Sequence, residues 1–201
     1  MDIDNVIKSL ECKGYRVSYF ENADEAVRYL NREIDSTTVG FGDSATLLDI
    51  KLFESLSSHN NVYDPQHCIH GECFIETAKK ALTSNVFLTS VNAVSETGEI
   101  VNIDGTGNRI AGSLFGHERV YFIVGINKLS TSLDNAVWRA RNIAAPKNAK
   151  RLKLNTPCAK NAERCFDCSS PDRICNGMMI HFRKMNDSDM EIVLINESLG
   201  F

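Results

Sequence analysis

Apolar residues recur along this chain in two spacings, and their alternation sets the expected order of helices and strands. Apolar positions three or four residues apart predict amphipathic helices, and short apolar or alternating runs predict strands that are at least half buried. The helices expected on this basis are Asp4–Lys13, a helix capped by Asn22 or Asp24, Ala45–Leu56, Phe74–Leu82, a short helix from Asn108, and Leu133–Ala144, which Pro146 should end. The strands expected are Tyr15–Phe20, Thr37–Phe41, Val62–Asp64, Val86–Thr89, Glu99–Ile103 and Val120–Val124. Strands that alternate with helices in this way predict an α/β fold with an open, mainly parallel sheet flanked by helices.

The last part of the chain is expected to depart from this alternation. Gly177–Lys184 and Glu191–Asn196 both have the pattern of strands, and Asp187-Ser188-Asp189 between them is typical of a tight turn. We therefore expect a C-terminal β-hairpin. The chain has 201 residues and contains no internal repeat or linker, so one domain over residues 1–201 is expected.

Polar, glycine-containing loops follow three of the apolar runs. Asn102–Arg109 places two glycines between an Asp, an Asn and an Arg, and Gly125–Lys128 follows the strand expected before it. If the strands before these loops are parallel neighbours, both loops open at the same edge of the sheet, where open α/β sheets bind ligands. Gly40–Ser44 leads from a strand into a helix start, whose free N–H groups attract anions. The alternative is that these loops are ordinary turns.

These loops supply the candidate site residues. Arg109 would pair with a carboxylate or phosphate, and Lys128 would add a second positive charge. Asp104, which adjoins a glycine and lies near cations, is the candidate general base. The candidate cofactor-binding residues in the same loops are Gly40, Gly42, Asp43, Ser44, Gly105, Gly107, Asn108 and Asn127.

A cysteine-rich loop is expected over residues 156–176. Four of the seven cysteines fall within 18 residues in the spacing C-x6-C-x2-C-x6-C, namely Cys158, Cys165, Cys168 and Cys175. A C-x2-C pair lets two thiolates reach one metal from a tight turn, and the flanking cysteines can complete a tetrahedral set. Nearby cations such as Arg164 and Arg173 would stabilise thiolates. Four thiolates suit an iron–sulfur cluster and zinc equally, and free or redox-active thiols without a metal are the third alternative.

A second group of cysteine and histidine residues lies earlier in the chain: His67, Cys68, His70 and Cys73. Its spacing fits none of the common zinc patterns. We expect a loop that leads into the helix at 74–82, with a metal site as the alternative.

Several long motifs resemble the lactate-utilization (LUD) domain family. They are N-A-V-S-E-T-G-E-I-V-N-I-D-G-T-G-N-R at 92–109, V-G-I-N-K at 124–128 and R-N-I-A-A-P-K-N-A-K-R-L at 141–152. Gly40–Leu47 resembles the early glycine loop of that family, and 156–176 resembles the cysteine segment of its short, stand-alone members. The resemblance implies a fold similar to the ribose-phosphate isomerase and CoA transferase-like fold, whose members hold anionic substrates at a comparable early loop. LUD domains occur in a lactate-oxidising system with iron–sulfur partners, which favours an iron–sulfur cluster at the cysteine segment.

Composition narrows the range of partners. The net charge is −4, and no aromatic and basic platform is present, so nucleic-acid binding is not expected. No apolar run approaches the roughly 20 residues needed to cross a bilayer. The N-terminus has acidic Asp2 and Asp4 and no apolar core region, so we expect a cytoplasmic protein that does not bind membranes. In that reducing compartment the seven cysteines should be thiols or metal ligands.

The resemblance implies a component of a soluble redox system that uses lactate or a related small 2-hydroxy acid. In this hypothesis a small anionic metabolite occupies the crevice, and iron–sulfur redox proteins are partners. The alternatives are a non-catalytic binding or sensing module with a structural metal, and an assembly protein that docks onto an iron–sulfur partner. G-x-S-x-G, Walker A and G-x-G-x-x-G are missing from the sequence. The sequence does not indicate whether the protein catalyses a reaction or which oligomer it forms.

Overall fold

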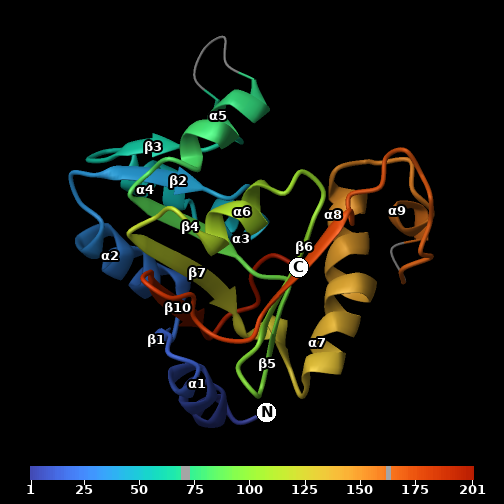
Figure 1. The fold of residues 1–201 in the computed structure, drawn as a ribbon, viewed down its shortest axis with the longest axis horizontal. Helices are drawn as coiled ribbons and strands as arrows, with labels where there is room; N and C mark the ends of the chain where they lie inside the picture. Colours follow the sequence, from blue (N-terminus) through green and yellow to red (C-terminus); the bar gives the residue numbers. More distant parts are fainter. Residues whose placement is uncertain (69–72, 162–163) are drawn as a thin grey trace.

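The main sheet of this protein is parallel throughout. The computed structural model describes residues 1–68, 73–161 and 164–201. Within them six strands pair in the order β1-β10-β7-β4-β2-β3, each parallel to its neighbours (Figure 1). The strands are β1 (Arg16–Phe20), β2 (Thr38–Phe41), β3 (Asn61–Tyr63), β4 (Val86–Ser90), β7 (Arg119–Gly125) and β10 (Asp189–Ile195). The expected α/β fold with a mainly parallel sheet is confirmed.

Helices cover both faces of this sheet. On one face, Ala26, Leu30 and Leu52 pack against the strands, and on the other face Val6 and Leu10 do so. The helices involved are α1 (Ile3–Cys12), α2 (Ala23–Glu33), α3 (Ala45–Asp49), α4 (Leu52–Leu56), α5 (Phe74–Ala81) and α6 (Asn108–Leu114). The single helix expected at 45–56 is instead two short helices, because Lys51 between them adopts a left-handed conformation with a φ of 52°.

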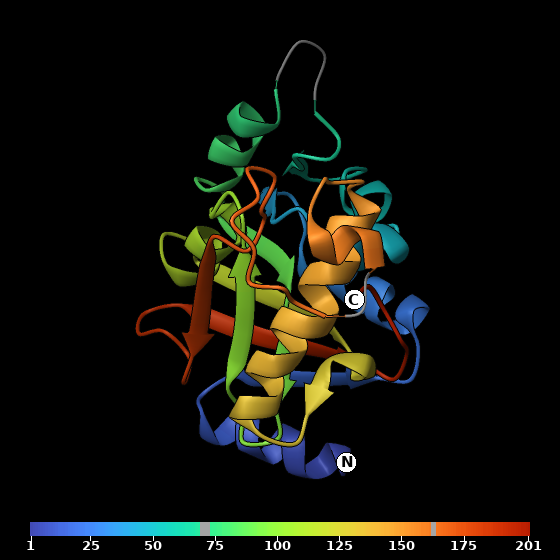
Figure 2. The same ribbon diagram turned by 90° about the vertical axis from the view of Figure 1, so that its right-hand side faces the viewer.

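A second, smaller sheet lies between the main sheet and a long helix. It has the order β8-β5-β6-β9, and its strands are β5 (Ala93–Ser95), β6 (Ile100–Asp104), β8 (Leu129–Ser130) and β9 (Gly177–His181). Val94 and Ile100 of this sheet pack toward the main sheet, whereas Val101 and Ile103 pack toward the long helix. Figure 2 shows this helix running across the face of the smaller sheet.

The expected C-terminal β-hairpin is wrong. β9 pairs antiparallel with β6 in the smaller sheet, and β10 lies between β1 and β7 in the main sheet, parallel to both. Met190–Ile195 is buried at every position. A central strand is covered on both faces, so it is buried at successive positions, and the one charged residue in this run, Glu191, is bonded to Arg16, Ser18 and Tyr29. A hairpin at the surface would leave one side of the run in water.

The long helix begins as α7 (Leu133–Arg139), passes through a π-helical turn η2 (Ala140–Ala144) and continues as α8 (Ala145–Arg151). The expectation that Pro146 ends the helix is therefore wrong. In the wide turn the N–H of Ala145 bonds to the carbonyl of Ala140, five residues back. This turn changes the hydrogen-bond register just before Pro146, which stands in the first turn of α8. The missing N–H of Pro146 is tolerated there because the first N–H groups of a helix have no partner within the helix.

A short helix, α9 (Pro157–Asn161), follows the long helix, and the 3₁₀ turn η1 (Ile126–Lys128) follows β7. The carbonyl of the last residue, Phe201, accepts a hydrogen bond from Nη1 of Arg139 in α7 at 3.2 Å. In the part of the chain that the structure describes, we find no helix with the length and apolar character needed to span a bilayer.

Candidate functional site

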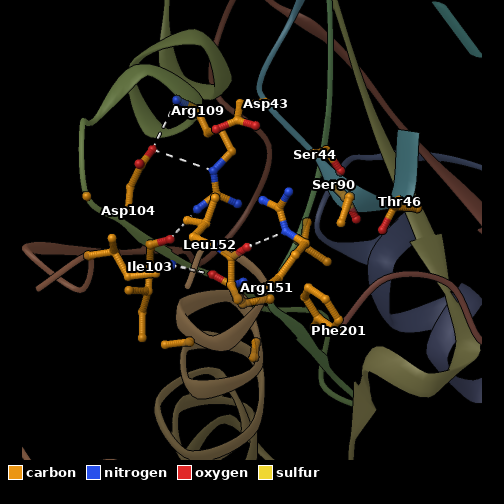
Figure 3. A pocket seen from close by; sticks show the side chains of 18 of the residues that line it. Asp43, Ser44, Thr46, Ser90, Ile103, Asp104, Arg109, Arg151, Leu152 and Phe201 are labelled. Carbon is orange, nitrogen blue, oxygen red and sulfur yellow. Dashed lines mark hydrogen bonds and ion pairs between the residues drawn. The ribbon is translucent and has the colours of Figure 1, made fainter. Parts of the chain in front are cut away.

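A cavity of about 120 Å³ lies where β2, β4 and β7 end at their carboxyl termini. Parallel sheets commonly bind ligands at this edge. Figure 3 shows Asp104 and Arg109 on one wall and Ser44 with Ser90 on the facing wall. The polar residues on its walls are Asp43, Ser44, Thr46, Ser90, Asn92, Asp104, Thr106, Asn108, Arg109, Lys128, Asn148 and Arg151.

The loops therefore converge, but for a reason that differs from the expected one. The convergence was expected only if Glu99–Ile103 and Val120–Val124 were parallel neighbours in one sheet, and that condition is not met. β6 belongs to the smaller sheet and runs antiparallel to β5. Packing of the two sheets against each other, not strand adjacency, brings Asp104–Arg109 to the same cavity as Lys128.

Lys128 forms part of the buried floor of the cavity. Its side chain is held by hydroxyl groups: Nζ donates to Thr46 Oγ1 and to Ser90 Oγ, both at 2.6 Å. The residue is 2% exposed. Burial, and then the positive charges of Arg139 and Arg109, lower the pKa of Lys128 from 10.5 to about 7, while Asp49 acts in the opposite direction. An amine near neutrality in a cavity is typical of functional lysines.

Asp104 is bonded to the backbone at the start of α6. Its carboxylate accepts from the backbone N–H of Thr106, Arg109 and Ile110 at 3.0 to 3.3 Å. It also lies 3.8 Å from the guanidinium Nε of Arg109, whose Nη2 donates to the carbonyl of Ile103. These bonds fix the direction of the Arg109 side chain, which points into the cavity (Figure 3).

Arg151 enters the cavity from α8, and sequence reasoning did not single it out. Its Nε donates to Asn148 Oδ1 at 3.0 Å, so the guanidinium is directed toward the cavity that Arg109 also lines (Figure 3). Its place in the motif at 141–152 was the signal that could have found it. Thr46 and Ser90 were also missed. Thr46 lies within the motif at Gly40–Leu47, which was the signal that could have found it, whereas no motif includes Ser90.

Arg139 ties together the chain segments around the cavity. Its Nε donates to the carbonyl of Asn127 at 3.0 Å, and its Nη1 donates to the carbonyls of Asn92 and Phe201. It is 8% exposed, and burial lowers its pKa to about 10. Arg139 therefore adds positive potential behind the cavity while it holds the loops in place.

Several predicted site residues lie away from the cavity wall and have packing roles. A Cβ on Gly40 would lie 2.3 Å from the carbonyl oxygen of Ala81, so the glycine permits close packing there. Gly42 packs in the same way against Thr89, and Gly107 starts α6 in a left-handed conformation. The amide group of Asn127 bonds to the backbone of Leu199. The predicted residues that do line the cavity are Asp43, Ser44, Asp104, Gly105, Asn108, Arg109 and Lys128.

The family model described as "LUD domain" matches residues 3–195, nearly the whole chain. The chain belongs to the LUD domain family. Among solved structures it is similar to a DUF162 family protein from Deinococcus radiodurans, with a TM-score of 0.53 and 8% sequence identity over 96% of this chain and 95% of that chain. At this identity the likeness concerns the fold alone. No curated protein matches the sequence.

The cysteine segment of this LUD domain lies beside the long helix. Cys165 Sγ accepts from the backbone N–H of Asp167 at 3.3 Å and lies 3.9 Å from Nη2 of Arg141. Arg173 donates to the carbonyls of Cys168 and Cys175. Burial raises the pKa of Cys175, Arg173 lowers it, and Cys165 and Cys168 raise it further.

Cys158 lies on α9, where its sulfur contacts Thr156 Oγ1 at 3.3 Å. All seven cysteines are free thiols. Over residues 1–68, 73–161 and 164–201, no group of three or more Cys, His, Asp or Glu side chains has an arrangement that could hold a metal ion. The metal site at the four cysteines stays a prediction.

The other cysteine and histidine residues of the LUD domain make local contacts. His67 Nδ1 lies 2.7 Å from Asp64 Oδ2, and its ring stacks on Phe53 with centroids 4.0 Å apart. Cys68 Sγ donates to the carbonyl of Pro65, and Cys73 caps the start of α5. His70 lies outside the described residues. The contacts of His67, Cys68 and Cys73 are those of a loop that leads into a helix.

Proposed function

We propose that the cavity of this LUD domain binds a small carboxylate, in particular a 2-hydroxy acid such as lactate, and that the protein serves a redox system for that acid. The observation that carries this proposal is the meeting of Arg109, Arg151 and Lys128 in one cavity. Asp43 and Asp104 line it too, but Asp43 bonds to Gln66, and Asp104 bonds to the start of α6. Arg109, Arg151 and Lys128 also have protein partners, but each carries further N–H groups that can donate to an anionic ligand in the cavity.

The size and chemistry of the cavity fit a three- or four-carbon acid. Its volume of about 120 Å³ leaves room for more than one water or for one small molecule. The guanidinium groups of Arg109 and Arg151 suit a carboxylate, which they can bind through paired hydrogen bonds. Lys128 then reaches the oxygen on the second carbon of the acid. In this arrangement Asp104 positions Arg109, and a proton-accepting role for it would require its bonds to α6 to break.

Binding can be measured by isothermal titration calorimetry with lactate, propionate and inorganic phosphate. Arg151→Gln should weaken lactate binding by about tenfold or more, since a hydrogen bond to a charged group contributes about 1.5–3 kcal/mol. Lys150→Gln is the matched control, because Lys150 is exposed on the same helix and lies off the cavity wall. Failure of lactate to bind the wild-type protein, or equal affinity of the two variants for lactate, would contradict the proposal.

The redox part of the proposal rests on the cysteine segment. Cys158, Cys165, Cys168 and Cys175 would hold an iron–sulfur cluster, which supplies electron transfer, or a structural zinc ion. The N–H and guanidinium groups near Cys165 support it, because such donors stabilise thiolates and cluster sulfur. Iron–sulfur proteins would then be redox partners. Metal analysis and a visible absorption spectrum after oxygen-free purification test it, and a metal-free, colourless protein would contradict it.

A second candidate function is a sensing module that binds the acid without turnover. The engagement of Asp104 by three backbone N–H groups favours it, since the predicted base is not free. Lactate-dependent dye reduction, with and without iron–sulfur partner proteins, separates the two functions. Binding without reduction in any combination would favour the module.

A further inference from the structure

The hydrogen bonds of Lys128 leave one face of its nitrogen toward the cavity. The hydroxyl of Ser90 donates its proton to the carbonyl of Ile123 at 2.6 Å. It therefore accepts the hydrogen bond from Nζ of Lys128. Thr46 Oγ1 is the other partner. Among the described residues Lys128 has these two hydroxyl partners and no ion pair with a carboxylate. The two hydroxyl groups thus hold the nitrogen in place, and neither of them brings a negative charge to compensate an ammonium group.

A neutral amine matches these surroundings better than an ammonium group does. An ammonium group has three protons to donate, and within residues 1–68, 73–161 and 164–201 the acceptors within hydrogen-bond distance of Nζ are Thr46 Oγ1 and Ser90 Oγ, so its third proton would face the cavity. A neutral amine donates its two protons to Thr46 and Ser90 and directs its lone pair to the cavity. Because burial lowers the pKa of Lys128 to about 7, a large share of the molecules carry the neutral amine near neutral pH.

We infer that Lys128 is a nucleophile that forms a reversible imine with a small 2-oxo acid bound in this cavity. A new bond joins Nζ to the carbonyl carbon, and the bond from that carbon to its oxygen breaks. Both amine protons leave with the oxygen as water, so no oxidant or reductant is consumed. Thr46 and Ser90 hold the nitrogen while it attacks.

The choice of a 2-oxo acid rests on the proposed carboxylate-binding function. With its carboxylate on Arg109 and Arg151, the acid would present the adjacent carbonyl carbon to Lys128, which lines the same cavity. A 2-hydroxy acid fits the same contacts but has no carbonyl group to react. Lactate should therefore bind and compete, whereas its two-electron oxidation product, pyruvate, should bind and become linked.

The experiment is reductive trapping on the full chain. Pyruvate and sodium cyanoborohydride are added near neutral pH, and intact mass and peptide mapping locate any adduct. We expect one adduct per chain at Lys128, with the mass of one pyruvic acid less one oxygen atom. Excess lactate should suppress it, and acetone, which lacks the carboxylate, should react about tenfold more slowly or less. Lys128→Met should abolish the adduct, and the control Lys150→Met should retain it.

Mapping of the wild-type adduct identifies the site even if a variant fails to fold. If calorimetry shows that lactate or pyruvate binds but no adduct forms at Lys128, the inference of an imine is wrong and the proposed function is unaffected. Failure of both acids to bind would overturn the proposed function and the imine with it. Labelling spread over surface lysines, or as fast with acetone as with pyruvate, would also overturn the inference.

Discussion

Replacement of Lys128 by methionine tests the buried amine at the floor of the cavity. Methionine has nearly the same length and no charge, so the substitution removes the amine without a large change in volume. In the folded protein the pKa of Lys128 is lowered from 10.5 to about 7 by burial and by Arg139 and Arg109. In the unfolded chain the amine keeps its ordinary pKa. Folding therefore disfavours the charged form, and the free energy of unfolding should depend on pH through this residue.

The magnitude follows from the difference between the two pKa values. From 10.5 to about 7 is about 3.5 units, which at about 1.4 kcal/mol per unit gives an upper limit of about 5 kcal/mol. The variant also loses the hydrogen bonds to Thr46 and Ser90, worth about 1 kcal/mol each. Below about pH 7, Lys128→Met should thus be more stable than wild type by up to about 3 kcal/mol. Above about pH 10, where the amine is neutral in both states, the variant should be less stable by about 2 kcal/mol.

The assay is urea unfolding at several pH values from about 6 to 10. The unfolded state binds more protons than the folded state in this window, so the stability of wild type relative to the variant should rise by about 1.4 kcal/mol per pH unit. Lys150→Met is the control and should show no such slope, because Lys150 is exposed. A difference that does not change with pH, or a variant that loses most stability at low pH, would refute the reasoning. Either result would show that the folded state holds a fully charged Lys128.

Three further predictions concern binding, acid stability and packing. An anion beside Lys128 raises the pKa of the amine, so lactate affinity should fall as the pH rises above about 7; calorimetry in buffers of different ionisation enthalpy should show proton uptake, and constant affinity would count against it. Burial would raise the pKa of Glu99, but three side-chain hydrogen bonds outweigh it and lower the pKa to about 2. Roughly 3 kcal/mol of stability, present above pH 4.5, should therefore be lost as the pH falls toward 2. In thermal melts, the melting temperature of Glu99→Gln should fall less over this pH range than that of wild type. Gly112→Ala would place a Cβ 2.4 Å from the ring of Phe87 and should lower stability by about 1–3 kcal/mol in urea unfolding; an unchanged midpoint would mean that the ring can move aside.

Local sequence pattern was sufficient for most helices and for the fold class. The helix expected at 4–13 is α1 at Ile3–Cys12, and Asn22 caps α2 as expected, because helix spacing and caps depend on residues within a few positions of each other. The same holds for the helix from Asn108. The motifs at 92–109 and 141–152 were sufficient to indicate the LUD family, which the match over residues 3–195 confirms. Arg109 ends the motif at 92–109, and Lys128 ends the motif at 124–128.

The tertiary structure decided how the strands pair and what the cavity contains. β9 and β10 are close in sequence but belong to different sheets, since the partners β6 and β7 that complete their hydrogen bonds lie far away along the chain. No local pattern marks Arg151 or Ser90 as neighbours of Lys128. Nor does any pattern set the pKa of a lysine, because its desolvation depends on what the folded chain packs around it. The chemistry of the site is thus a property of long-range packing, whereas the elements that carry it were encoded locally.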